Sequence, residues 1–269
     1  MGKAASEVES PGLSRLLQQA AGAVADLGTE FFHHQSRLVD LSARLAEGRF
    51  HLAVLGQFKR GKSTLLNALV GEDILPVGVV PLTAAPTFIK YGPKPKVRVD
   101  FREDRPSDEL VDAATERARE FLVQFVTEGA NPENRRGVAE VHVELSAPIL
   151  SSGVVLIDTP GIGSTYRHNT LATLNFLEQC DAALFLVSAD PPITEVELEF
   201  LHQVRQKVPR LFFVLNKIDY LDRRELAEAL GFYRRVLCEQ AGYSQDHPVF
   251  CISARRGLES KVTGDITAW

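Results

Sequence analysis

The sequence GQFKRGKS, from Gly56 to Ser63, decides the fold of this chain. It follows an apolar run from Phe50 to Leu55 and precedes a segment, residues 64–69, whose apolar residues recur at helical spacing. A glycine loop between a strand and a helix is the context in which the G-x-x-x-x-G-K-S pattern binds phosphate. Gly56 and Gly61 let successive N–H groups point at one anion, and the helix adds its positive end. The stretch therefore predicts a nucleotide site.

Individual residues of this loop have separate expected roles. Lys62 can reach the β- and γ-phosphates of a nucleotide, and Ser63 offers a hydroxyl to Mg²⁺, which prefers oxygen ligands. The residues expected to contact the nucleotide from this loop are Gly56, Gln57, Phe58, Lys59, Arg60, Gly61, Lys62, Ser63 and Thr64.

A second motif, Asn216-Lys217-Ile218-Asp219, follows an apolar run and predicts which base is bound. The Asp219 carboxylate can accept hydrogen bonds from both the N1–H and the exocyclic amine of guanine. Adenine has neither donor there and would leave a desolvated carboxylate unpaired, which is costly. Asn216 can bond the base and connect neighbouring loops, while the stem of Lys217 lies along the ring. The exit of an expected last strand adds N–H groups behind the base, from Ser253, Ala254 and Arg255.

Between these two motifs, residues 154–157 (VVLI) predict a buried strand that ends in Asp158, which is placed to hold Mg²⁺ through a water molecule. The N–H of Gly161 can then meet a γ-phosphate. Three motifs in this order, each after its own strand, form a GTPase signature. The sequence therefore predicts an α/β fold with the ligand at the carboxyl ends of parallel strands.

The chain resembles the GTPase domain of dynamin superfamily proteins, and more closely the bacterial dynamin-like proteins, over roughly Phe50 to Leu258. The phosphate and base motifs are common to many GTPases. The segments LPVGVVPLTA (75–84) and DPPITE (190–195) point to dynamins, and DTPG (158–161) agrees with them. The resemblance implies a P-loop GTPase fold, with a mostly parallel sheet flanked by helices.

The resemblance also implies that Thr83 is the switch threonine, which closes on Mg²⁺ and the γ-phosphate. Thr83 follows a segment punctuated by Gly and Pro that can move as a switch. The alternative is that Thr83 merely lies in a loop and that Thr87, at the start of the next expected strand, has no role either. The expected catalytic residues are Lys59, Lys62 and Thr83, and the expected metal ligands are Ser63, Thr83 and, through water, Asp158.

The catalytic segments depart from relatives at two places. Ile162 stands where Ras-like GTPases have the glutamine that orients the attacking water, so Thr83, backbone groups or a partner must hold it. Animal dynamins place Gln-Ser at Phe58-Lys59, with a monovalent cation beside the serine, whereas guanylate-binding proteins place an arginine finger at the position of Lys59. Lys59 therefore either supplies the catalytic charge or is a solvated surface lysine. We expect Arg60 to point outward or to be engaged across a dimer.

The N-terminal segment has apolar residues three or four apart from Leu17 to Leu45, which predicts one helix from about Leu13 to Glu47. The helix either packs on its own domain or forms part of a neck with partner helices, because so long a seam would otherwise face water. Gly22 and Gly28 weaken an isolated helix and favour a partner. In dynamin-like proteins the helix before the GTPase domain bundles with helices from the far C-terminus.

These observations predict three regions. They are a neck helix at 1–48, a dynamin-type GTPase domain at 49–258, and at 259–269 the start of a neck or a truncated end. Residues 96–101 and 138–145 alternate with the two-residue period of strands, and 108–128 has helical spacing, so we expect a sheet extended relative to a minimal GTPase. Later helices are expected near 170–179, 194–208 and 222–241. Because the chain stops at Trp269, soon after its last strand, we expect a stalk and membrane-binding parts to lie outside it.

The composition of the 269 residues narrows the class further. A hydrophobic content of 45% is ample for one large α/β domain with an appendage. The net charge is −5 and no basic stripe is interleaved with aromatic residues, so nucleic acid is not an expected partner. The three cysteines lack metal spacing and suit a reducing compartment. No signal peptide and no apolar run near ~20 residues is seen, so a cytoplasmic location is expected.

The leading hypothesis is a mechanochemical, dynamin-like GTPase that uses Mg²⁺. GTP binding would drive head-to-head homodimerisation, hydrolysis would release it, and the full-length protein would associate peripherally with a membrane and remodel it. One alternative is an Era-like GTPase of ribosome assembly, which the long N-terminal helix and the absence of a basic module disfavour. The other is a nucleotide-gated interaction module with little turnover.

Overall fold

The computed structural model describes residues 10–46, 48–78, 85–102, 105–161, 174, 176–189 and 193–265. The chain divides into two compact units, Met1–Phe50 and His51–Trp269, each with its own internal packing. Thr83, Ile162 and residues 190–192 of the DPPITE segment lie outside the described residues. Their expected roles therefore stay predictions.

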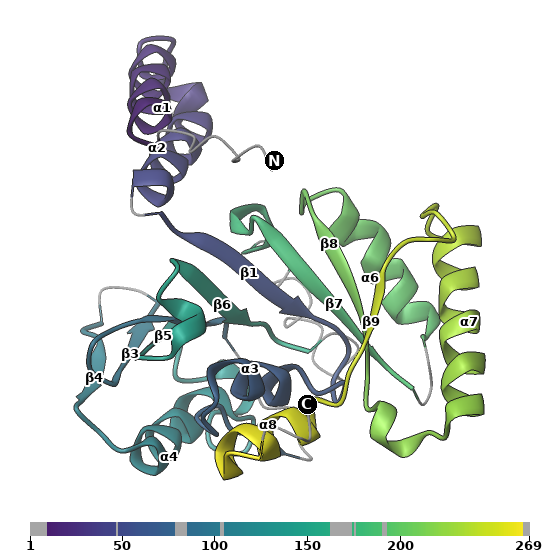
Figure 1. Ribbon diagram of the computed structural model, residues 1–269. Coiled ribbons are helices and arrows are strands. Elements are labelled where there is room, and N and C mark those ends of the chain that lie inside the picture. The colour runs from purple at the N-terminus through teal and green to yellow at the C-terminus, as the bar shows by residue number, and fades with distance from the viewer. Residues whose placement is uncertain are drawn as a thin grey trace, which may run out of the picture. The chain divides into compact units, whose positions relative to one another are not determined.

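The larger unit is built on a mixed sheet (Figure 1). Its strands are β1 Phe50–Leu55, β2 Thr87–Tyr91, β3 Lys96–Phe101, β4 Asp108–Val111, β5 Val138–Leu145, β6 Val154–Asp158, β7 Ala182–Ser188, β8 Leu211–Asn216 and β9 Val249–Cys251. Among the described residues these nine strands have the order β4-β3-β5-β2-β6-β1-β7-β8-β9. The run β1-β7-β8-β9 is parallel, as is the β2-β5 pair, whereas β2-β6, β3-β5 and β3-β4 are antiparallel. The predicted mostly parallel, extended sheet is confirmed.

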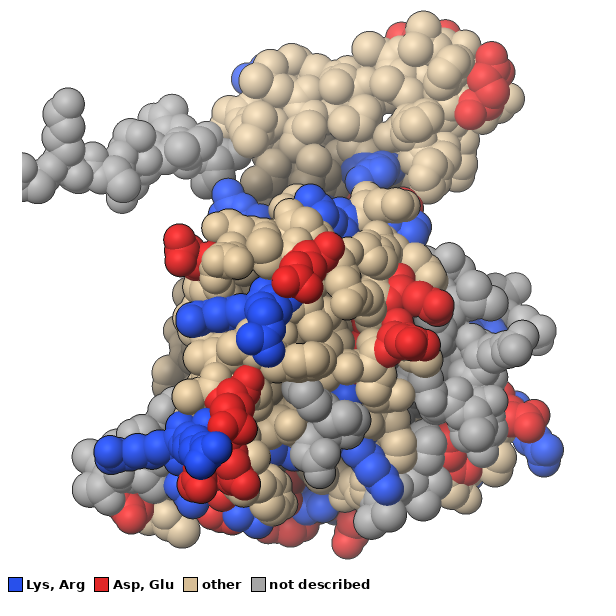
Figure 2. Space-filling model, turned by 90° about the vertical axis from the view of Figure 1, so that its right-hand side faces the viewer, with Lys and Arg blue, Asp and Glu red and all other residues tan. Residues whose placement is uncertain are grey.

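Helices cover both faces of this sheet. They are α3 Lys62–Val70, α4 Thr115–Val126, α6 Glu195–Arg205, α7 Arg223–Glu239 and α8 Ala254–Thr263, and the short 3₁₀ turns are η2 Pro132–Asn134, η3 Pro148–Leu150, η4 Leu177–Gln179 and η5 Ile218–Tyr220. Alternate side chains of a strand point to opposite faces. Val54 of β1 accordingly packs in a core shared with α3 and α4, and Leu55 in another shared with α6 and α7. The face that carries α7 mixes basic and acidic side chains (Figure 2).

Two helix predictions in this unit need correction or completion. The predicted helix at 108–128 is wrong in its first part, because Asp108–Val111 pair with β3 as an edge strand and α4 begins only at Thr115. Pairing with β3 satisfies backbone groups that four residues of marginal helix would leave to solvent. The helix expected near 170–179 lies mostly outside the described residues, and its end is η4.

The predicted domain boundary at Leu258 falls inside α8, which continues to Thr263. This helix packs on α3, since the Lys261 Nζ donates to the carbonyl oxygen of Leu69 at 3.0 Å. Gly257 lies over Ala68, and an added Cβ would be 3.7 Å from the Ala68 Cβ. The residues after Leu258 up to Thr263 are thus part of the larger unit, while a neck beginning beyond them stays a prediction.

The N-terminal unit is a helical hairpin, so the predicted single helix from Leu13 to Glu47 is wrong. Helix α1 (Ser10–Ala25) and helix α2 (Phe32–Ala46) pack against each other and are joined by the turn η1 (Thr29–Phe31). The break falls at Gly28, whose φ of 128° is outside the helical region and is readily adopted only by glycine. A seam of apolar residues at helical spacing fits one long helix and two packed helices equally well, because both bury the same stripe.

Two buried serines connect the helices of this hairpin by hydrogen bonds. Ser14 and Ser42 are both buried, and each donates its hydroxyl to the other's backbone carbonyl, at 3.0 and 2.9 Å. Their small side chains bring the two backbones together. Leu17, Val24, Leu38 and Leu41 are half-buried along the hairpin. Leu27 and Phe32, near the turn, remain exposed.

We expect Ser42→Leu to destabilise the hairpin by about 1–3 kcal/mol, because the larger side chain forces apart two backbones that now touch. Hydrogen exchange of the α1 and α2 amides measures this directly, and the amides of β1 and α3 in the same sample serve as the internal reference. Val39→Leu, at an exposed position of α2, is the matched control. Unchanged protection in Ser42→Leu would contradict the packing described.

Candidate functional site

The loop between β1 and α3 requires glycine at both of its ends. Gly56 has a φ of 150°, and a Cβ there would lie 2.4 Å from the carbonyl oxygen of Leu186 in β7. Gly61 has a φ of 92°, and a Cβ there would lie 2.5 Å from the Asn216 side-chain nitrogen at the end of β8. Real Cβ atoms do not approach so closely, so the loop can close on the ends of these strands only with glycine at both positions.

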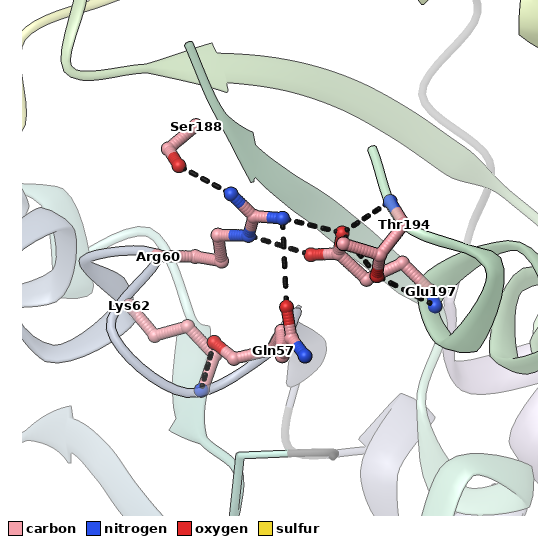
Figure 3. Close-up of polar contacts among 6 residues, drawn as sticks. All are labelled: Gln57, Arg60, Lys62, Ser188, Thr194 and Glu197. Carbon is pink, nitrogen blue, oxygen red and sulfur yellow. Dashed lines mark hydrogen bonds and ion pairs between the residues drawn. The ribbon is translucent and has the colours of Figure 1, made fainter. Parts of the chain in front are cut away.

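Lys62 folds back over the loop that precedes it. Its buried Nζ donates to the carbonyl oxygen of Gly56 at 3.1 Å. It also lies 3.4 Å from the carbonyl oxygen of Gln57 (Figure 3). Burial lowers the pKa of the Lys62 ammonium, while the carboxylates of Asp158 and Glu197 oppose the shift. An anion placed in the loop would therefore meet a desolvated cation at the N-terminal end of α3.

The chain after β6 completes the phosphate side of the site. The Ser63 hydroxyl donates to Asp158 Oδ2 at 2.7 Å, which brings together the two described residues that were predicted to bind metal. A hydroxyl and a carboxylate beside a phosphate loop are hard oxygen donors that fit Mg²⁺. Gly161 closes over the loop, since an added Cβ would lie 3.1 Å from both the Lys62 Nζ and the Phe58 nitrogen. Thr87, the other threonine considered, is buried within β2 opposite Asp158.

The base motif joins three loops. The Asn216 amide donates to the Arg60 carbonyl oxygen at 2.8 Å and accepts from the Ala254 N–H at 3.0 Å. Asp219 accepts from the Ser253 hydroxyl at 2.6 Å and from the Arg255 guanidinium at 3.0 Å. The structure thus places Ser253, Ala254 and Arg255 beside Asn216 and Asp219, while their predicted role behind the base stays a prediction. Both carboxylate oxygens of Asp219 accept from protein donors, which fixes the carboxylate just after the end of β8.

The expected orientation of Arg60 is wrong. Its side chain is 4% exposed and donates through Nε and Nη2 to both carboxylate oxygens of Glu197, at 2.7 and 2.6 Å (Figure 3). A further donor, Nη1, contacts the Ser188 hydroxyl at the end of β7. Burial of the guanidinium is favourable here because a fully buried carboxylate pairs with it in a two-point geometry.

Glu197, Ser188 and the capping role of Thr194 were missed from the sequence. A detectable signal existed for part of this set: the T-x-x-E spacing of Thr194 and Glu197 is that of a capping box at a helix start. That pattern indicates where α6 begins, but it carries no information about which distant residue the glutamate contacts.

Lys59 is exposed and has a left-handed backbone, with a φ of 65°. Its Nζ lies 5.4 Å from the centre of the Phe58 ring. In the single chain, Lys59 is therefore turned outward, and both interpretations of it remain open. The observed conformation already fits a solvated surface lysine. A catalytic role would require a partner surface that turns the Lys59 side chain towards the phosphates.

The fold and this site define a nucleotide-binding α/β domain of the P-loop GTPase class. Residues 52–218 match the family model described as "Dynamin family", so the chain belongs to the dynamin family. That match covers the phosphate loop, the strand that ends in Asp158 and the first residues of the base motif.

Relatives agree with this membership. An uncharacterized protein of Caldicellulosiruptor sp. is 39% identical over 223 residues, which are 83% of this chain and 53% of that protein. The bacterial dynamin-like protein of Nostoc punctiforme is 34% identical over 182 residues, 66% of this chain and 26% of the relative. An oligomerised bacterial dynamin pair has the same fold with a TM-score of 0.61 at 18% identity, over 96% of this chain and 41% of that one. The chain thus spans about half or less of these relatives.

The lowered pKa of Lys62 leads to a prediction about pH. Phosphates would raise that pKa again, so binding takes up a proton, and affinity for GDP should fall as the pH rises through the alkaline range below 10.5. Calorimetry in buffers of different ionisation enthalpy measures this uptake. Burial also lowers the pKa of Lys217, which repulsion by Arg60 assists, so Lys217→Met is the control that assigns the proton. Affinity independent of pH, without proton uptake, would refute the prediction.

Proposed function

We propose that this chain binds and hydrolyses GTP as the GTPase domain of a dynamin-like mechanochemical protein. The observation that carries the proposal is the convergence of three groups at the carboxyl ends of β1, β6 and β8. They are the glycine-closed loop with buried Lys62, the Ser63–Asp158 pair, and Asp219 with both oxygens facing donors. The loop with Lys62 suits phosphates, the Ser63–Asp158 pair suits a hard cation, and Asp219 suits guanine.

Residues of the chain divide the work of hydrolysis. Lys62 and the N-terminus of α3 stabilise charge that develops on the phosphates, which is the main route of catalysis in phosphoryl transfer. Ser63 and, through water, Asp158 would hold Mg²⁺, which when bound neutralises phosphate charge. Since Ile162 cannot orient the attacking water, Thr83, backbone groups or a partner would do so.

Head-to-head dimerisation and a membrane function rest on family membership and on one geometric observation. The exposed, outward Lys59 becomes a catalytic cation only if a second head covers the loop. One structural neighbour is described as a bacterial dynamin pair that oligomerises and tethers membranes. In the described residues, no helix has the length and apolarity needed to cross a bilayer. We propose a cytoplasmic protein whose membrane contact is peripheral and made by parts outside this chain, with the N-terminal hairpin as part of its neck.

The low-turnover, nucleotide-gated module remains the second candidate, because the same outward Lys59 leaves the single chain short of a catalytic charge. Family membership favours a dynamin over a ribosome-assembly GTPase. The two remaining functions differ in what pairing does: it stimulates hydrolysis in a dynamin-like enzyme and leaves turnover negligible in a gated module.

Guanine recognition is tested at Asp219. We expect GDP to bind at least about 100-fold tighter than ADP, since guanine adds two donors to the Asp219 carboxylate, whereas adenine would desolvate the carboxylate further without adding any, at a cost of several kcal/mol. Asp219→Asn should shift the preference towards xanthosine diphosphate, whose carbonyl accepts where guanine donates. Titration calorimetry with the three diphosphates measures this, and equal affinity for ADP and GDP would remove the assignment.

Turnover tests the role of Lys59. We expect the GTPase rate per chain to rise with protein concentration and to be independent of K⁺ and Na⁺. Lys59→Ala should retain GTP affinity and lose about 10³-fold or more in the stimulated rate, because a finger acts mainly in the transition state. Phosphate release measured across a concentration series reports all three effects. Normal stimulated turnover in Lys59→Ala, or strict K⁺ dependence of the unmodified chain, would contradict the role proposed for Lys59.

A further inference from the structure

We propose that Arg60 is a positioning residue for the phosphate loop, and that its buried ion pair with Glu197 makes the start of α6 a working part of the nucleotide site. The inference rests on the proposed GTP-binding function and extends it to a residue pair that lies behind the loop. The side chains of Arg60 and Glu197 are engaged with each other. They act by fixing the shape of the loop expected to bind the phosphates.

The contacts of Arg60 hold the loop from two directions. Its carbonyl oxygen accepts from the Asn216 amide at 2.8 Å, which connects it to the base motif. Its side chain reaches Glu197 through two donors and Ser188 through a third, which connects it to α6 and to the end of β7 (Figure 3). A residue bound through both its backbone and its side chain has little freedom to rotate. The residues on either side of it, Lys59 and Gly61, are therefore held as well.

The turn that contains Lys59 depends on the same anchor. The Arg60 N–H donates to the Gln57 carbonyl oxygen at 3.3 Å, and the Arg60 Nη2 lies 3.5 Å from Gln57 Oε1. Lys59 lies inside this turn with a φ of 65°. A left-handed non-glycine residue is held there by its surroundings against its own preference. We infer that the Arg60 anchor sets both the path of the loop and the direction in which Lys59 leaves it.

Glu197 serves two structural elements with one carboxylate. Its Oε2 accepts from Arg60 Nη2 at 2.6 Å and also from the backbone N–H and hydroxyl of Thr194, both at 3.0 Å. The Thr194 hydroxyl in turn accepts from the Glu197 N–H at 3.3 Å, which completes the capping box of α6. The N-terminus of α6 and the phosphate loop are thus fastened to the same group. A change in one alters the geometry of the other.

Replacing both partners of the Arg60–Glu197 pair shows whether the pair positions the phosphate loop or only stabilises the fold. Glu197 is fully buried and Arg60 nearly so, and removing two charges from water is expensive. Well-packed apolar residues of similar volume commonly replace a buried ion pair without loss of stability, whereas removing one partner alone is strongly destabilising. If the pair only stabilised the fold, an apolar replacement of both partners would restore everything. If it positions the loop, such a replacement would restore the fold but not the site.

The experiment compares the unmodified chain with Arg60→Met, Glu197→Leu and the double variant Arg60→Met/Glu197→Leu. We expect each single variant to lower the melting temperature, and the double variant to recover the part lost through the unpaired charge, though not the part due to the α6 capping box, which Glu197→Leu also removes. We expect the double variant still to bind GDP about 10- to 100-fold more weakly, because a loop displaced by about 1 Å loses that much in a precisely arranged site. Hydrogen exchange should show faster exchange at the amides of residues 57–61 in the double variant, which loss of the α6 capping box alone would not cause.

The matched control makes the same chemical change at a surface pair. Arg224 and Glu228 on α7 form an exposed ion pair at 3.0 Å, and Arg224→Met/Glu228→Leu should leave GDP affinity unchanged. Arg60→Lys adds a second readout, since lysine retains the charge but cannot donate to both carboxylate oxygens in one plane. It should keep the fold and lose part of the affinity.

The outcomes separate this inference from the proposed function. Absence of GDP binding by the unmodified chain would remove the proposed function itself. GDP binding by the unmodified chain and equally tight binding by a stable double variant would overturn the positioning role alone. If the single variants fail to fold, the GDP affinities of the double variant and of Arg60→Lys are compared with that of the unmodified chain, and the same two results decide.

Discussion

The close approach of the phosphate loop to the ends of β7 and β8 is the constraint on which the rest of the structure depends. Gly56 lies against the backbone of Leu186, and Gly61 against the side chain of Asn216. Neither contact tolerates a Cβ. With the loop pressed onto the sheet in this way, α3 must begin at Lys62, and the Lys62 ammonium must fold back over the loop carbonyls. The strand order of the sheet then brings Asp158 and Asp219 to the same edge.

Four charged side chains are buried in and behind the phosphate loop. Lys62, Arg60, Asp158 and Glu197 are all buried within the larger unit. Two of them, Lys62 and Asp158, face the expected ligand, and the other two pair with each other. The site therefore contains a cation poised for phosphate next to a cation already neutralised by protein. This division explains how two basic residues separated by a single glycine can have different roles.

The N-terminal hairpin follows a different logic from the nucleotide unit. Two small polar residues, Ser14 and Ser42, connect its helices by hydrogen bonds, and its large apolar side chains are half-buried or exposed wherever the structure describes them. Such a surface leaves apolar area available on the hairpin, which agrees with the proposed neck. The relatives extend well beyond the length of this chain, which spans 53% of one and 26% of another.

The sequence by itself determined the phosphate loop, the base motif, most strands and the family, because these depend on local patterns: glycine spacing, period-two alternation and residues that follow strands. It did not determine the break at Gly28, the edge strand at Asp108–Val111 or the burial of Arg60. In each case the local sequence permits two conformations, and a contact with a distant segment selects one of them: the packing of α1 on α2, the pairing with β3, and the ion pair with Glu197. Arg60 is the plainest case, since its partner Glu197 lies 137 residues away. An arginine in a loop is normally solvated, and only the arrival of a buried carboxylate from α6 makes the interior the more favourable place for it.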